Sequence, residues 1–158
     1  MILAISLLGC SHWPSSGVPA TLPRFHEFPV STQALAAATA QAVRSSRFGL
    51  QLDVRASYPD LLTTRKQTLS VKGIKALARR GDPGLWGVLL AARLTVRLAI
   101  RRSHIQTGHS RITIHPEFMA YISQLGDHRQ WIRWVSNDVL EDELFAGIEA
   151  LLRLPDGE

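Results

Sequence analysis

Two neighbouring stretches in the second half of the chain alternate between apolar and polar side chains, and this period of two constrains the fold more than any other feature. The first stretch runs from Arg93 to Arg101 and the second from Arg111 to His115. A period of two places successive side chains on opposite faces of a β-strand. The polar break between the stretches contains Thr107-Gly108. We therefore predict an antiparallel hairpin with one buried face and one wet face.

The arginines of the first stretch are also four residues apart, as they would be on a helix face, but the alternation of the second stretch favours a strand. With the turn near Thr107, the predicted register places three pairs of residues opposite each other: Ile100 and Ile114, Arg101 and Thr113, and Arg97 and Glu117. Apolar then meets apolar and an arginine meets a glutamate, and each such pair contributes roughly 0.2–1 kcal/mol to a sheet.

Two longer helices are predicted, one on each side of the hairpin along the chain. Ser31 or Thr32 can cap a helix that continues to Val43, and the following residues form its apolar stripe: Leu35, Ala38, Ala42 and Val43. Ser136 or Asn137 can cap the last helix, whose first turns hold Asp138, Glu141 and Asp142, acids that complement the helix dipole. Its predicted buried stripe is Val139, Leu140, Leu144, Ile148, Leu151 and Leu152.

The segments between these elements carry weaker signals. Residues 48–58 alternate, which predicts a strand with one wet face, and residues 61–69 fit either an extended segment or a loop. Ser70 to Arg80 reads as a short basic helix that ends at Gly81, with four residues turned inward: Val71, Ile74, Leu77 and Ala78. Of Trp131 and Trp134, we expect one in the core and the other over the sheet edge.

The chain has room for one domain. It holds 158 residues, of which 46% are hydrophobic and 20% charged, the composition of a globular protein with a real core. The predicted class is α+β: an antiparallel sheet with a long hairpin in the C-terminal half and with the N-terminal and C-terminal helices packed on one face. The predicted division is residues 1–9 as a leader, 10–28 as an anchor and tether, and 29–154 as the single α+β domain.

The leader carries the one motif that points to a protein class. Residues 2–9 are uncharged and mostly apolar, and they end at Leu7-Leu8-Gly9-Cys10, which holds the only cysteine of the chain. A Pro-, Ser- and Gly-rich stretch follows, as expected of a tether. The motif resembles the lipobox of bacterial lipoproteins. The resemblance implies that Cys10 is the lipid-attachment site, that the chain is exported, and that Ser11 directs it to the outer membrane. The alternative is that Ile2 to Leu8 form a buried first strand of a cytoplasmic domain, with Cys10 as an inert core thiol.

The polar face of the predicted hairpin is the candidate binding surface. Its arginines are Arg93, Arg97, Arg101 and Arg111, side chains that pair with carboxylate and phosphate alike. The net charge is +5, but the arginines are scattered rather than gathered in a block. We therefore expect these arginines to bind a protein partner rather than nucleic acid, in addition to the membrane contact through Cys10. The alternative is that they form a solvated sheet face without a partner.

No catalytic or metal-binding pattern emerges. His104, His109 and His115 lie on or beside the predicted hairpin at places that do not converge, and one cysteine cannot build a multi-cysteine zinc site. Neither a nucleophile elbow nor a phosphate-binding glycine loop occurs. We expect no enzyme activity, no cofactor and no metal. The predicted function is that of an outer-membrane lipoprotein with an accessory or assembly role in the periplasm, and the alternative is a cytoplasmic nucleic-acid-binding module that uses the arginine row.

Overall fold

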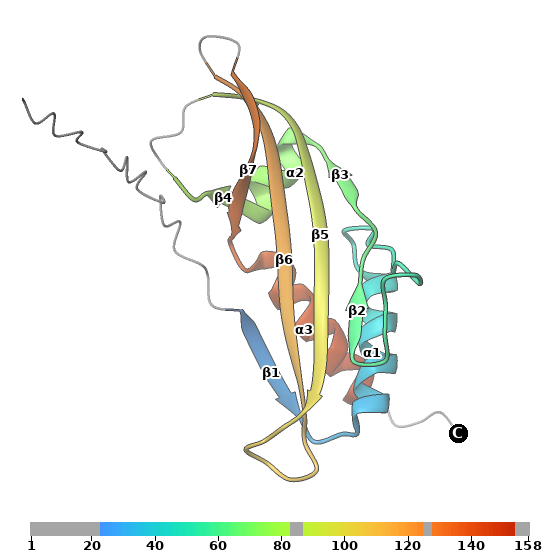
Figure 1. Ribbon diagram of the computed structural model, residues 1–158. Helices are drawn as coiled ribbons and strands as arrows, with labels where there is room; N and C mark the ends of the chain where they lie inside the picture. The colour runs from blue at the N-terminus through green and yellow to red at the C-terminus, as the bar shows by residue number, and fades with distance from the viewer. Residues whose placement is uncertain (1–22, 83–86, 125–127, 154–158) are drawn as a thin grey trace, which may run out of the picture.

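The computed structural model describes residues 23–82, 87–124 and 128–153, which form three helices and a seven-stranded antiparallel sheet (Figure 1). The class is therefore α+β, as predicted. In chain order the elements are β1 (Arg24–Phe28), α1 (Thr32–Ser45), β2 (Leu61–Thr63), β3 (Gln67–Leu69), α2 (Val71–Leu77), β4 (Ala78–Arg80), β5 (Val88–Arg102), β6 (Ser110–Ser123), β7 (Arg129–Ser136) and α3 (Val139–Arg153).

The long hairpin of β5 and β6 is the centre of the sheet, and its existence confirms the main prediction from the alternation. Its register differs from the predicted one: Ile100 pairs with Ile112, Arg101 with Arg111, and Arg97 with His115. The turn is centred one residue earlier than predicted, near Gln106. It is closed by Ser103, whose N–H donates to the His109 carbonyl (2.9 Å) and whose hydroxyl accepts from two backbone N–H groups inside the loop. Since the shift is two residues, every side chain keeps its predicted face and changes only its partner.

Five strands run in the order β2-β5-β6-β7-β4, with β3 also on β5 and β1 also on β6. The outer edge of β6 is divided between two partners, because β1 pairs with Ser110–Ile114 and β7 pairs with Phe118–Ser123 (Figure 1). Pro116 lies in the gap between them. Its partner Val96 exchanges hydrogen bonds with Thr64 on the other side, so the backbone of Pro116 points into the gap. A proline leaves no N–H unpaired there.

The core is formed by buried side chains of the helices and of the sheet. In the view of Figure 1 the helices lie behind the strands, and α1 contacts α3 as well as β5 and β6. The α1 prediction is confirmed: the Ser31 hydroxyl accepts from Ala34 N–H (3.2 Å), and the whole predicted stripe is buried. The sheet contributes a second row of fully buried side chains: Leu94, Val96, Leu98, Ile100, Ile112, Ile114, Phe118 and Ile122.

Two predictions in the first half of the chain are wrong. Residues 48–58 form only isolated bridges, at Leu52 and Tyr58, and no strand. Gly49, with φ of 65°, turns the chain, and Asp53 closes a second turn by accepting from Arg55 N–H (3.1 Å). Phe48 and Leu52 pack against the core from this loop, which explains the apolar signal. The predicted basic helix ends early, at Leu77, because Ala78–Arg80 leave it to pair with β7 as strand β4. Val71, expected inward, is exposed.

Residues 61–69, which the sequence left open, form the short strands β2 and β3 on the free edge of β5. The first strand begins earlier than the predicted domain: Arg24–Phe28, placed in the tether, pair with β6. The rest of the leader and tether, including Cys10, lies outside the described residues.

The last helix is confirmed, but its beginning differs from the prediction. It starts at Val139, directly after Asp138, whose φ is 70°, so neither Ser136 nor Asn137 occupies the cap position. Val139, predicted to be inward, is exposed, whereas Glu141 and Phe145 are buried. Trp134 is in the core, as expected for one of the two tryptophans.

Candidate binding surface

The outer face of the sheet, which lies opposite the core, carries the predicted arginines. Along β5 the core positions Leu94, Val96 and Leu98 alternate with Arg93 and Arg97, so the arginines face solvent. Arg101 continues this row, and Arg111 is its direct partner on β6. All four predicted arginines therefore share one face. Arg133 of β7 joins them, because it pairs with Met119 at a solvent-facing position of β6.

The charges of Arg97 and Arg133 both affect the pKa of His115. Partial burial lowers the pKa of His115, and the positive charges of Arg97 and Arg133 lower it further. The neutral imidazole is therefore favoured at neutral pH, so the positive charge of this part of the face comes from the arginines. Arg133 was not among the predicted arginines, because Trp131-Ile132-Arg133-Trp134 does not alternate between apolar and polar residues.

An aromatic pair holds Arg93 in place. The rings of Tyr121 and Trp131 lie 5.1 Å apart, and the Arg93 guanidinium lies over the Trp131 ring at 4.2 Å from its centroid. Arg93 belongs to β5 and Trp131 to β7, so this contact crosses β6. Such a cation–π contact restrains the planar guanidinium of Arg93 on the outer face of the sheet.

Arg111 differs from the other arginines because an acid neutralises it. Its Nε and Nη2 donate to Oε1 of Glu27 at 2.9 and 2.6 Å, and its guanidinium lies 4.3 Å from the centroid of the Phe25 ring. The hydrogen bond from Arg111 is the main reason that the pKa of Glu27 is lowered. Arg111 thus ties β1 to β6. The sequence could not reveal this pair, because Glu27 was assigned to the tether.

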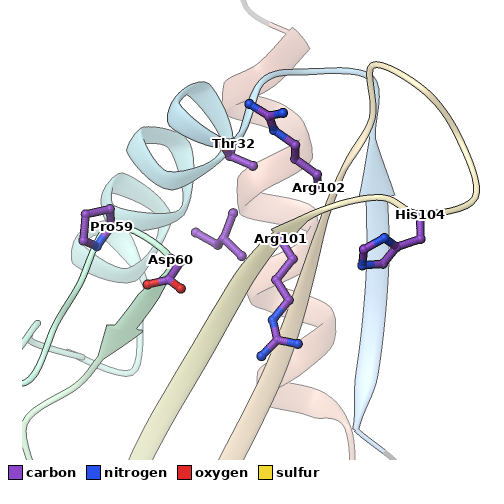
Figure 2. Close-up of a pocket in the computed structure, with 7 residues that line it drawn as sticks. Thr32, Pro59, Asp60, Arg101, Arg102 and His104 are labelled. Atoms are coloured by element: carbon purple, nitrogen blue, oxygen red, sulfur yellow. The ribbon is translucent and has the colours of Figure 1, made fainter.

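A hollow of about 500 Å³ lies at the turn end of β5, lined by Thr32, Pro59, Asp60, Ile100, Arg101, Arg102 and His104 (Figure 2). Figure 2 shows that Arg101 and Arg102 leave the strand in opposite directions. The cationic groups therefore do not converge on one point, as an anion-binding pocket would require.

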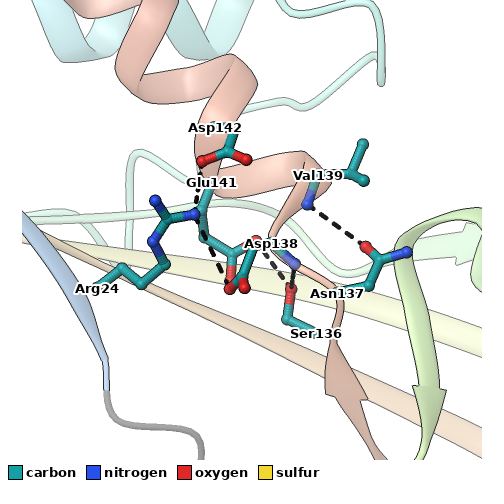
Figure 3. Close-up of polar contacts among 7 residues, drawn as sticks. All are labelled: Arg24, Ser136, Asn137, Asp138, Val139, Glu141 and Asp142. Carbon is teal, nitrogen blue, oxygen red and sulfur yellow. Dashed lines mark hydrogen bonds and ion pairs between the residues drawn. The ribbon is translucent and has the colours of Figure 1, made fainter.

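A network of polar side chains surrounds the start of α3 (Figure 3). The Glu141 side chain is 3% exposed, and the Ser136 hydroxyl donates to its Oε2 at 2.8 Å. Burial raises the pKa of Glu141, while the Ser136 hydrogen bond opposes this effect. Arg24 lies between Asp138 and Asp142, with its Nη1 4.0 Å from the first carboxylate and 2.5 Å from the second. A cavity of about 50 Å³ adjoins the network at the gap beside Pro116.

Within residues 23–82, 87–124 and 128–153, no three His, Cys, Asp or Glu side chains gather closely enough to hold a metal ion. Over the same ranges, no helix is long and apolar enough to cross a membrane.

Comparison with known proteins gave no match: no family model, no curated protein and no solved structure corresponds to this chain. The surface itself is therefore the basis for a functional proposal.

Proposed function

We propose that this chain is a non-catalytic accessory protein of the cell envelope, held at the outer membrane by lipid on Cys10, and that its outer face binds an acidic partner protein. The observation that carries the binding role is the set of unpaired arginines on that face. Arg93, Arg97, Arg101 and Arg133 form no ion pair with any described residue.

Charge complementarity supports an acidic partner. Two acids accompany the arginines on the described part of this face: Glu27, which Arg111 already neutralises, and Glu117, which pairs across the hairpin with Thr95. Guanidinium groups bind carboxylates through two parallel hydrogen bonds, so a row of them recognises an acidic surface. Arginine, tyrosine and tryptophan are also the residues that most often dominate the binding energy of protein interfaces.

The lipid anchor is supported by Leu7-Leu8-Gly9-Cys10 and by the Pro-, Ser- and Gly-rich residues that separate it from β1. In this arrangement the anchor holds the domain near the membrane, and arginines of the sheet face bind the partner.

The binding role is tested on the full chain with Cys10→Ser, using poly-L-glutamate as the probe and fluorescence anisotropy as the readout. The triple variant Arg97→Gln, Arg101→Gln, Arg133→Gln should bind at least tenfold more weakly. The matched control Arg44→Gln, Lys72→Gln, Lys75→Gln removes the same charge from exposed helix positions and should bind within twofold of the parent. Equal losses in both variants would contradict a specific face. Tighter, strongly salt-dependent binding of an oligothymidylate would favour the nucleic-acid alternative.

The anchor is tested separately by expressing the chain in a bacterial host and partitioning the lysate with Triton X-114. The parent should enter the detergent phase with an acyl mass on Cys10, and Cys10→Ser should stay in the aqueous phase. An unmodified parent chain in the aqueous phase would overturn the lipoprotein proposal and leave the binding proposal intact.

A further inference from the structure

A β-bulge near the start of β5 turns apolar side chains toward solvent. Leu89 pairs with Ile122 and Ala91 with Tyr121, so Leu90 between them has no cross-strand partner. The extra residue reverses the alternation on its N-terminal side. Val88 therefore lies opposite Ser123, on the outer side of β6, instead of entering the core. Val88 is 67% exposed and Leu90 is 49% exposed.

The approach of the chain to the bulge depends on Gly87. A Cβ atom at this position would lie 2.7 Å from the backbone oxygen of Ser123, which no real side chain tolerates. The glycine thus allows β5 to begin in close contact with the end of β6. The outward position of Val88 follows from this backbone path and from the bulge together.

The exposed aliphatic residues share this end of the sheet with the aromatic pair, and we call Val88, Leu90, Tyr121 and Trp131 the bulge patch. Three arginines accompany it on β5 and β7: Arg93 over the Trp131 ring, Arg129 opposite Ser123, and Arg133. Exposed apolar side chains that are grouped together and rimmed by polar residues are typical of an interaction site.

We propose that the bulge patch docks onto the surface of an anionic phospholipid bilayer. Val88 and Leu90 would enter the boundary between headgroups and acyl chains, and Trp131 and Tyr121 would lie at headgroup depth, where such rings concentrate. The guanidinium groups of Arg93, Arg129 and Arg133 would bind lipid phosphates, while their stems cover apolar surface.

The mixture of side chains favours a lipid surface over an acidic protein. An acidic protein surface offers negative charge alone. An anionic bilayer offers negative charge and, directly beneath it, an apolar layer that exposed valine and leucine side chains can enter. The contact does not depend on the proposed lipid anchor, because it uses only folded residues of the domain. The contact shares Arg93 and Arg133 with the proposed protein-binding face but does not use Arg97 or Arg101. The double variant Arg97→Gln, Arg101→Gln should therefore weaken polyglutamate binding and leave flotation unchanged, which separates the two proposals.

The test is flotation of the full chain carrying Cys10→Ser with vesicles of phosphatidylcholine and phosphatidylglycerol (3:1) or of phosphatidylcholine alone. The chain should float with the anionic vesicles and at least tenfold less with the neutral ones. The double variant Val88→Asn, Leu90→Asn should partition about tenfold more weakly, and Arg129→Gln, Arg133→Gln should lose roughly fivefold per arginine.

The matched control is Val54→Asn, Ile105→Asn, which changes two aliphatic residues that are even more exposed, at 80% and 76%, and that lie far from the patch in the sequence. Its flotation should equal that of the parent. Trp131→Phe should remove the fluorescence blue shift that vesicles induce. Because all four aliphatic positions are exposed, melting temperatures should stay unchanged and verify folding.

Three results would overturn the proposal: no flotation of the parent, equal flotation with neutral vesicles, or an equal loss in the control. Binding of polyglutamate that is sensitive to Leu90→Asn, without any flotation, would assign the patch to an acidic protein instead.

Discussion

The hydroxyl group of Ser136, at the end of β7, donates a 2.8 Å hydrogen bond to the buried carboxylate of Glu141 in the first turn of α3. The same oxygen accepts from the backbone N–H of Asp138 at 3.2 Å, so it also serves the residue of positive φ between strand and helix (Figure 3). One side chain thus satisfies two polar groups at the junction. Loss of these two hydrogen bonds should therefore lower the free energy of unfolding.

Replacing Ser136 with alanine should lower the free energy of unfolding by about 1–3 kcal/mol, because it leaves a buried carboxylate and a backbone N–H without their partner. Urea denaturation followed by circular dichroism measures the change. Ser45→Ala is the control, since that exposed hydroxyl donates only to helix carbonyls. A loss for Ser136→Ala no larger than for Ser45→Ala would contradict the role of this junction.

Glu141→Gln should raise stability at neutral and alkaline pH. Because burial raises the pKa of Glu141 above its ordinary value of 4.5, the folded chain binds a proton more tightly than the unfolded chain. Stability from this group therefore falls as the pH rises from about 4.5 through the folded-state pKa. Glutamine keeps an acceptor for Ser136 without the charge. The expected rise in melting temperature at pH 8 is about 2–4 °C, as roughly 1 kcal/mol gives in a chain of this size.

Thermal melts of Glu141→Gln and the parent between pH 4 and pH 8 test this sign. The two melting temperatures should converge toward pH 4. A constant difference at all pH values would show that packing rather than ionisation separates the two proteins.

Glu27→Gln should destabilise the chain at pH 7, because it removes the ion pair that ties β1 to β6. Here the pKa is lowered, so the stabilisation is present above the ordinary pKa of 4.5 and disappears as the pH falls through the folded-state value. The difference from the parent should therefore shrink below pH 4. The variant also frees Arg111, and its affinity for polyglutamate should rise about two- to fivefold, the effect of one exposed charge. Anisotropy titrations at pH 7 measure it, and an unchanged affinity would contradict it.

Two glycines should respond to alanine in opposite directions. In Gly147→Ala the new methyl group would meet the Cβ of Ala42 at 3.5 Å, an ordinary contact, and a helix interior favours alanine by about 0.5–1 kcal/mol. Stability should rise. In Gly87→Ala the methyl group would collide with the Ser123 carbonyl, and a loss of about 1–3 kcal/mol is expected. Urea denaturation of both variants compares them; equal signs would contradict the packing described at one of the two sites.

The alternation of apolar and polar residues determined much of this protein by itself. A period of two reflects the geometry of a single strand, so Arg93, Arg97 and Arg101 could be placed on one solvent face once the alternation of residues 111–115 had favoured a strand over a helix. The same holds for α1, where Ser31 and the apolar stripe act within a few residues of each other.

Tertiary structure alone decided which residues meet. The turn is centred one residue earlier than predicted, which shifted the register by two residues and made Arg111 the partner of Arg101 without changing any face. Pairing across the sheet turned Arg24–Phe28 into a strand and gave Arg111 the carboxylate of Glu27. Close approach at Gly87 and the bulge at Leu90 reversed the local alternation, and packing of α3 buried Glu141, whose neighbours in the sequence suggested a solvated first turn. Each outcome depends on groups distant in the sequence, because burial and pairing are set by the elements that cover a residue and not by the residue itself.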